Sequence, residues 1–186
     1  RYLTSKGLRK DAEGVGKLSK EDITMIENGY SNYIYKNKFS TYPRIYQSIW
    51  ELDVYFKGGN PSGHSITQRI EFVKNGLRLF MKHPVFGVGT GDIHKDLMQM
   101  YHDSGSKLDE KFWRRAHNQY LTFYITFGVV GGSLILFALF LPPYFEKKYA
   151  TNLFIIFFLI AVLSMINEDT LETQAGLTFF VYFYAL

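Results

Sequence analysis

Apolar side chains recur every three or four residues along the first part of the chain, which predicts amphipathic helices. The clearest repeat runs from about Ser65 to His83, and Pro84 ends it. Residues 1–18 show little periodicity and are predicted to form a loop, whereas Ser19 is typical of a helix start. The apolar positions of the predicted helices are Ile23 and Ile26; Ile45, Ile49, Leu52 and Phe56; Ile66, Ile70, Val73, Leu77 and Phe80; and Ile93, Leu97, Met100 and Tyr101.

The pattern changes at Tyr120, where a run without any charged residue begins and continues to Leu141. At ~1.5 Å rise per residue, such a run matches a hydrocarbon core of ~30 Å. Pro142 and Pro143 are expected to end this helix. Two more apolar runs follow. We therefore expect an all-α membrane protein in which a mostly helical extramembrane loop domain precedes about three transmembrane helices, at 119–141, 149–167 and 175–186, the last one truncated.

This pattern divides the chain into a polar region, 1–116, and a membrane region, 117–186. A helix restarting near Asp109 is expected to lead through His117 into the bilayer. Both ends of the chain look cut, so we expect a piece of a larger polytopic protein. Alternating spans place the acidic turn at 168–174 on the same side of the membrane as His117. Positive residues in short loops favour the cytoplasmic side of a membrane. The lysines of the loop at 144–151 and the arginines before His117 lie at opposite ends of the first span, so the sequence does not decide which end is cytoplasmic.

The distribution of charge supports the division into a polar region and a membrane region. The chain has 186 residues and a formal charge of +4, and 19 of its 21 Lys and Arg residues lie in residues 1–118. A basic segment attached to a membrane favours anionic lipid or phosphate-bearing substrates over nucleic acid. The absence of cysteine excludes disulfides and thiolate metal sites. No metal-ligand spacing is present, and we expect neither a metal nor a cofactor.

His117 is the first candidate for chemistry, because imidazole exchanges protons near neutral pH and this one lies at the mouth of a membrane helix. Arg114 and Arg115 precede it, and their fixed positive charge would favour the neutral imidazole that accepts a proton. The alternative is an interfacial histidine that only caps or anchors the helix.

Arg69 is the second candidate, since a guanidinium offers a planar fork of donors that matches phosphate oxygens. The alternative is an ordinary solvated arginine on the polar face of its helix. Glu168, Asp169 and Glu172 could orient a substrate, bind a metal ion or pair with the cationic residues, or they could form a solvated turn.

The segment Gly87-Val88-Gly89-Thr90-Gly91 resembles a phosphate-binding loop only superficially. Dinucleotide-binding loops need G-x-G-x-x-G spacing and a preceding strand, and here a helix ending in proline comes first. We predict a tight turn that requires positive φ angles instead.

Taken together, several motifs resemble the O-antigen ligase and polymerase family of bacterial membrane glycosyltransferases. The resemblance covers about residues 66–132, and residues 1–60 match no family pattern. The motifs are Gln68-Arg69-Ile70, then Phe80-Met81-Lys82-His83-Pro84 and Phe86-Gly87-Val88-Gly89-Thr90-Gly91, then Ala116-His117-Asn118-Gln119-Tyr120-Leu121 and Gly128-Val129-Val130-Gly131.

The resemblance implies a metal-independent transferase whose donor is a glycan on undecaprenyl diphosphate and whose acceptor is lipid A-core, another glycan or a protein. His117 would be the general base, Arg69 would bind the diphosphate, and Arg114, Arg115 and Glu172 would contact substrate. The resemblance also implies a multi-pass protein of the bacterial inner membrane, with residues 1–117 on the periplasmic side. The upstream spanning helices of the family are missing, so this piece alone should be inactive. The rival hypothesis is a non-catalytic membrane protein whose basic segment binds a partner or anionic lipid.

Overall fold

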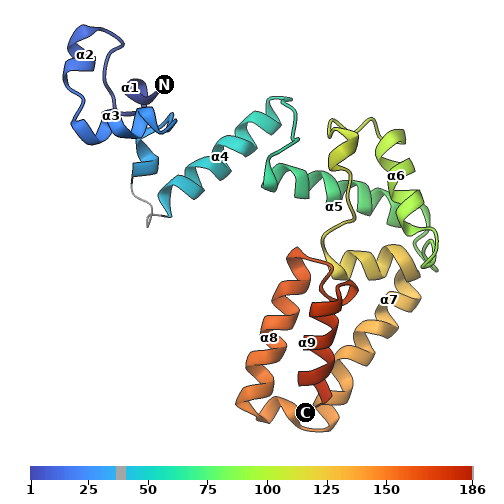
Figure 1. Cartoon of the computed structure of the whole chain (residues 1–186). Coiled ribbons are helices and arrows are strands. Elements are labelled where there is room, and N and C mark those ends of the chain that lie inside the picture. The colour runs from blue at the N-terminus through green and yellow to red at the C-terminus, as the bar shows by residue number, and fades with distance from the viewer. Residues whose placement is uncertain (37–40, 186) are drawn as a thin grey trace. The chain divides into compact units, whose positions relative to one another are not determined.

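The computed structural model describes residues 1–36 and 41–185, and every regular element among them is helical (Figure 1). Residue 186, the last of the run predicted at 175–186, lies outside the described residues. The helices are α1 (Tyr2–Ser5), α2 (Ala12–Gly16), α3 (Lys20–Glu27), α4 (Tyr42–Phe56), α5 (Ser65–Lys82), α6 (Ile93–Asp103), α7 (Gln119–Phe145), α8 (Asn152–Asn167) and α9 (Gln174–Ala185), with 3-10 turns η1 (Tyr33–Lys36), η2 (Glu110–Phe112), η3 (Lys148–Ala150) and η4 (Thr170–Glu172).

The chain divides into two compact units, Arg1–Val54 and Tyr55–Leu186. In the first unit the buried carboxylate of Asp22 accepts hydrogen bonds from the Lys6 ammonium and from the Tyr2 hydroxyl at 2.8 Å. The bond from Lys6, followed by those from Ser19, holds the pKa of the Asp22 carboxyl well below its usual range. Asp22 thus joins the start of α3 to α1.

The prediction that residues 1–18 form a loop is wrong, because α1 and α2 lie within them. Both helices are too short to give an apolar period. Asp11 caps α2 by accepting a hydrogen bond from the Gly14 amide at 2.8 Å. The helix expected after Ser19 is confirmed as α3, with a capping box formed by Ser19 and Asp22.

In the second unit, α5 and α6 pack on each other, and α5 also packs on α7. The predicted apolar face of α6 is confirmed, since all four of its residues are buried. The helix predicted from about Ser65 to His83 is confirmed as α5, but its apolar face is not the side that is most buried. Leu77 is 45% exposed, and the buried side of the helix is largely polar. The buried residues of α5 are Thr67, Glu71, Phe72, Asn75, Gly76 and Leu79.

A hydrogen-bond network explains how polar residues of α5 turn inward. Glu71 accepts from the Tyr55 hydroxyl at 2.6 Å and from Ser106 Oγ at 2.9 Å, while Asn75 Oδ1 accepts from Ser104 Oγ at 2.7 Å. Burial alone would raise the pKa of the Glu71 carboxyl, but these hydroxyl donors and the Lys74 ammonium, 3.3 Å from Glu71 Oε1, together outweigh burial, and the pKa lies below its usual value. Because the network satisfies the buried polar groups, α5 can turn its apolar stripe outward.

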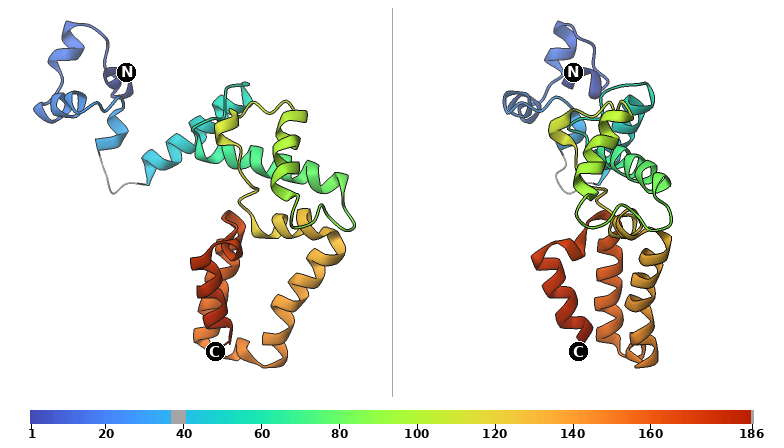
Figure 2. Two further views of the ribbon diagram at one scale, coloured as in Figure 1. Left: turned by 45° about the vertical axis from the view of Figure 1, so that its right-hand side comes forward. Right: turned by 90° about the vertical axis from the view of Figure 1, so that its right-hand side faces the viewer.

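Helix α7 is not the straight helix predicted at 119–141, because Gly128 interrupts it with φ 66° and ψ −170°. The first segment runs across the top of the second, which descends (Figures 1 and 2). The loop that follows α5 replaces the missing helical hydrogen bonds. The Val88 and Gly89 amides donate to the carbonyls of 125 and 126, and the amides of 129 and 130 donate to the carbonyls of 84 and 85.

The predicted tight turn at Gly87 and Gly89 is confirmed, since both have positive φ. A Cβ at Gly87 would lie 2.4 Å from the Thr126 backbone, and one at Gly128 would lie 2.2 Å from the Val85 carbonyl oxygen. Only glycine fits where the two backbones meet this closely. The Gly-x-Gly pattern therefore serves the break in α7.

Helix α7 also passes through Pro142 and Pro143, where the sequence predicted its end, and continues to Phe145. Prolines lack the N–H groups that would bond the carbonyls four residues earlier. The Tyr184 hydroxyl lies 3.2 Å and 3.0 Å from those two carbonyl oxygens, of residues 138 and 139. Because α9 supplies this donor, the last turn of α7 is tolerated.

Helices α7, α8 and α9 run alongside one another below α5 and α6 (Figures 1 and 2). Among the described residues, α7 is the one helix long and apolar enough to cross a membrane, and α8 is a shorter apolar helix. The shared core of the three helices is mainly aromatic, while large aliphatic side chains such as Leu159 and Leu163 are more than half exposed. Its buried residues are Leu139, Phe154, Phe157, Phe158, Ala161, Met165 and Phe180.

Candidate functional site

His117 lies directly before the N-cap of α7 and has a left-handed backbone, with φ 47°. The predicted helix through this residue is wrong, since only the short turn η2 precedes it. Asn118 fixes the turn: its side chain accepts from the Leu121 amide at 2.8 Å and donates to the Ile166 carbonyl at 2.9 Å. The histidine is therefore held against the end of α8.

One carboxylate joins His117 to Arg69. Glu168 Oε2 lies 3.0 Å from His117 Nδ1, and its Oε1 lies 3.3 Å from Arg69 Nη2. The imidazole ring also packs on Phe72 of α5, with ring centroids 5.3 Å apart. The structure thus brings together His117 and Arg69, the two leading candidates from the sequence. They meet through Glu168, which the sequence had placed only on the same side of the membrane as His117.

The contact with Glu168 decides which ring nitrogen of His117 can act as a base. A carboxylate accepts a hydrogen bond from Nδ1–H, so the neutral ring presents Nε2 as its proton acceptor. Within the described part of the chain, Nε2 has no hydrogen-bond partner, and the side chain is 33% exposed. The histidine therefore has the orientation and access that a general base requires.

A polar seam along α7 positions Glu168. The buried Gln119 accepts from the Leu171 amide at 2.8 Å, and the Thr122 hydroxyl donates to Asp169 at 2.6 Å. These bonds fix the segment just after Glu168, and the bond from Asn118 to the Ile166 carbonyl holds the segment just before it. Sequence reasoning did not identify Gln119 or Thr122; the signal available was a pair of polar residues within an otherwise apolar run.

The other predicted site residues have different partners. Arg115 forms an ion pair with Glu172, which ties the segment before α7 to η4. Arg114 is exposed, and its guanidinium donates to the carbonyl of Trp113 at 2.9 Å. The structure therefore pairs two of the three residues with each other and places Arg114 in contact with neither His117 nor Arg69.

The single contact between Arg69 and Glu168 leaves most guanidinium donors available. Both side chains are about half exposed, and ion pairs of this kind contribute little to stability. Arg69 lies one turn before Phe72, whose buried ring anchors α5. An anion arriving beside Glu168 could accept hydrogen bonds from Arg69 without disturbing the fold.

An open groove of about 790 Å³ adjoins the site, with Arg69 on its wall. Its lining is mostly the apolar face that the sequence predicted for α5, together with Asn167 from the end of α8. The lining residues are Ile66, Arg69, Ile70, Val73, Lys74, Leu77, Arg78, Met81 and Asn167.

A family model described as O-antigen ligase matches residues 23–137, more than half of the chain. The chain belongs to the O-antigen ligase family. No curated protein and no solved structure matches it. The match includes Arg69 and His117 and starts well before residue 66, where the predicted resemblance began. Glu168 and Glu172 lie outside it.

O-antigen ligases are membrane glycosyltransferases that join a lipid-linked glycan to an acceptor, so membership confirms the family and the general reaction class inferred from the motifs. The described residues contain no group of three or more metal-binding side chains close enough to share an ion. The family match therefore covers His117 and Arg69, and the structure adds the carboxylate of Glu168 that joins them.

Proposed function

We propose that the site around Glu168 transfers a glycan from undecaprenyl diphosphate to an acceptor hydroxyl. The observation that supports this proposal most directly is that the Glu168 carboxylate contacts both His117 and Arg69. Glycosyl transfer from a diphosphate needs a base for the incoming hydroxyl and positive charge for the leaving group. Family membership supports the reaction class.

In the proposed step, Nε2 of His117 takes the proton from the acceptor hydroxyl while the hydroxyl oxygen attacks the anomeric carbon of the glycan. The bond between that carbon and the diphosphate oxygen breaks, and undecaprenyl diphosphate leaves with the electron pair. Arg69 neutralises the charge that develops on the leaving group. Glu168 holds Nδ1–H and stabilises the imidazolium that forms.

Roles for the remaining predicted residues follow from their partners. We assign Arg115 and Glu172 a structural role, because they form an ion pair with each other. This pair would hold η4 against the segment before α7. Arg114, whose guanidinium faces solvent, is proposed to contact the acidic substrate. We assign neither a metal ion nor a cofactor to the step.

The proposal extends to topology. We infer three membrane helices: the second segment of α7, α8 and α9, with residues 1–117 on the periplasmic side of a bacterial inner membrane. At 1.5 Å per residue the second segment of α7 is about 25 Å long, close to the ~30 Å hydrocarbon core. The exposed aliphatic surface of α8 supports lipid contact. The lysine-bearing η3 would then face the cytoplasm, as positive residues in short loops prefer.

Replacing Arg69 by lysine is expected to lower the transfer rate about 10²-fold, because charge survives but the planar fork that matches a diphosphate is lost. The measurement is initial-rate transfer by the intact, reconstituted protein with a synthetic polyprenyl-diphosphate glycan. Arg44→Lys makes the same exchange on an exposed position of α4 and should leave the rate unchanged. A near-normal rate for Arg69→Lys would argue against bidentate capture of the diphosphate.

The same assay, with products analysed by mass spectrometry, identifies the acceptor. Lipid A-core, a growing glycan and a protein hydroxyl give products that differ in mass. Glycan transfer to any one of them supports the proposal. Binding of donor without turnover on any of them would favour the rival, a non-catalytic membrane protein.

A further inference from the structure

Helix α5 carries an apolar stripe that lies outside the buried core clusters of the described residues. Ile66, Ile70, Val73, Leu77 and Met81 follow one another at helical spacing, and all of them line the open groove. Leu77 is 45% exposed and Met81 66% exposed, because the opposite side of the helix packs against α6 and α7. Ile66, Ile70 and Val73 are partly buried, so the stripe is most exposed toward the C-terminal end of α5, and apolar surface of this kind points to a hydrophobic partner.

Basic residues flank the stripe on both sides. At 100° per residue, Arg69 lies on one side of the stripe, and Lys74 and Arg78 lie on the other. All three line the same groove. A helix that buries an apolar face between rows of Lys and Arg is typical of membrane-surface helices, where the long side chains reach the headgroups while their stems cover acyl chains.

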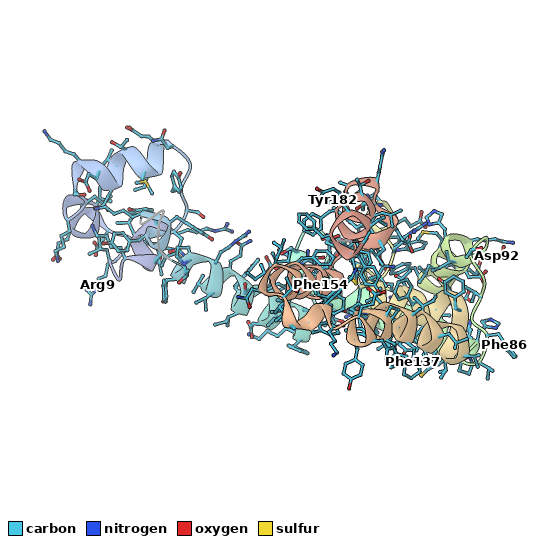
Figure 3. The ribbon with its side chains drawn as sticks, turned by 90° about the horizontal axis from the view of Figure 1, so that it is seen from below. Arg9, Phe86, Asp92, Phe137, Phe154 and Tyr182 are labelled. Atoms are coloured by element: carbon cyan, nitrogen blue, oxygen red, sulfur yellow. The ribbon has the colours of Figure 1, made fainter. Side chains whose placement is uncertain are left out.

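The apolar surface continues beyond α5 into the break of α7. Val85 is 51% exposed and Phe86 78% exposed, and the amides of Val129 and Val130 donate to the carbonyls of residues 84 and 85. Below the break, Phe137 on the descending segment of α7 is 59% exposed. Figure 3 shows Phe86 and Phe137 on the same side of the molecule. Lipid that surrounds this segment of α7 would therefore meet Phe86 and then α5.

We propose that α5 lies in the plane of the membrane surface, with its apolar stripe and Phe86 in the acyl chains and with Lys74 and Arg78 on anionic phospholipid headgroups. The apolar surface is continuous with the helix that is long and apolar enough to cross a membrane. The cations along its rim match an anionic lipid surface better than they match another apolar protein face. This inference rests on the proposed membrane placement of α7, which the Phe137 reference below tests separately, and it does not depend on the transfer chemistry.

The test uses single cysteines, since the 186 residues contain none. Ile70→Cys, Leu77→Cys and Phe86→Cys variants of the intact protein carry a nitroxide label in vesicles of phosphatidylcholine and phosphatidylglycerol that lack polyprenyl lipid. Collisions with oxygen, which concentrates in acyl chains, are compared with collisions with a water-soluble nickel chelate. Phe137→Cys is the lipid reference, and Lys95→Cys on the exposed side of α6 is the water reference.

We expect labels at the three test positions to be several-fold more accessible to oxygen than to the nickel chelate, as at Phe137. Accessibility to nickel like that of Lys95 would overturn the proposal, because the stripe would then face water. Shielding from both reagents would also overturn it, because protein would then cover the stripe. Unchanged elution on size-exclusion chromatography identifies the variants that have folded.

Discussion

Replacing His117 by asparagine should abolish glycan transfer while leaving the protein folded and abundant. Asparagine tolerates the left-handed backbone observed at φ 47°, so this exchange avoids strain that alanine would add. Its amide cannot accept a proton from the acceptor, and loss of a general base costs about 10²–10⁴-fold in rate. Initial-rate transfer by reconstituted protein, with surface glycan in cells as a second readout, measures the loss.

His94→Asn is the matched control, because His94 lies on the exposed side of α6. It should transfer glycan at the normal rate. Normal transfer by His117→Asn, at normal abundance, would contradict the assignment of the base and would favour the hypothesis in which the basic segment only binds a partner or lipid.

Replacing Gly87 by alanine should strongly lower the amount of folded protein. The residue has φ 70°, and its new Cβ would lie 2.4 Å from the Thr126 backbone. The left-handed conformation costs about 1–2 kcal/mol for a residue with a Cβ, and each hydrogen bond broken between the loop and α7 adds about 1 kcal/mol. Fluorescence-detected size-exclusion chromatography after detergent extraction measures the folded fraction over a temperature series.

Gly91→Ala tests the same motif without the clash. Among the described residues, a Cβ added at Gly91 would meet no other atom within 4 Å, and the backbone there does not have a positive φ. The folded fraction of Gly91→Ala should equal that of the unaltered protein. Equal behaviour of the two variants would contradict the view that the loop after α5 replaces the hydrogen bonds of the broken helix.

Periodicity predicted the helices well where one apolar face packs inward. The inward face of α6 is an example, and the end of α5 near His83 follows from Pro84. Periodicity could not give the orientation of α5, because a stripe of Ile, Val and Leu has the same pattern whether it packs inside the protein or lies at its surface. The network around Glu71, which draws the polar face inward, depends on residues distant in sequence.

The break in α7 was missed for a related reason. Hydropathy averages over the run, so one glycine within it leaves the signal of a single spanning helix intact. The structural requirement at Gly128 arises from a loop some forty residues earlier. Pro142 and Pro143 likewise predicted the end of the helix. The helix continues because the Tyr184 hydroxyl lies within hydrogen-bond distance of the carbonyls that the prolines cannot bond.

For the site, the sequence supplied the residue types and the structure supplied their arrangement. His117 and Arg69 stood out through their chemistry and through the family motifs. Alternation of spans placed the acidic turn on the side of His117, but could not say which of its acids faces the imidazole. Glu172 was chosen from the sequence, whereas Glu168 makes the contact, because rotation within a short turn has no signature in the sequence.

The most direct test of the proposed site compares Glu168→Gln with Glu172→Gln in the transfer assay, with thermal stability measured alongside. Glutamine keeps the shape of either side chain and removes the charge that fixes His117. We expect Glu168→Gln to lower kcat about 10²-fold at unchanged stability, by analogy with carboxylates that orient catalytic or metal-bound histidines, and Glu172→Gln to transfer at a near-normal rate. A normal kcat for Glu168→Gln would contradict the proposal that this carboxylate orients the base.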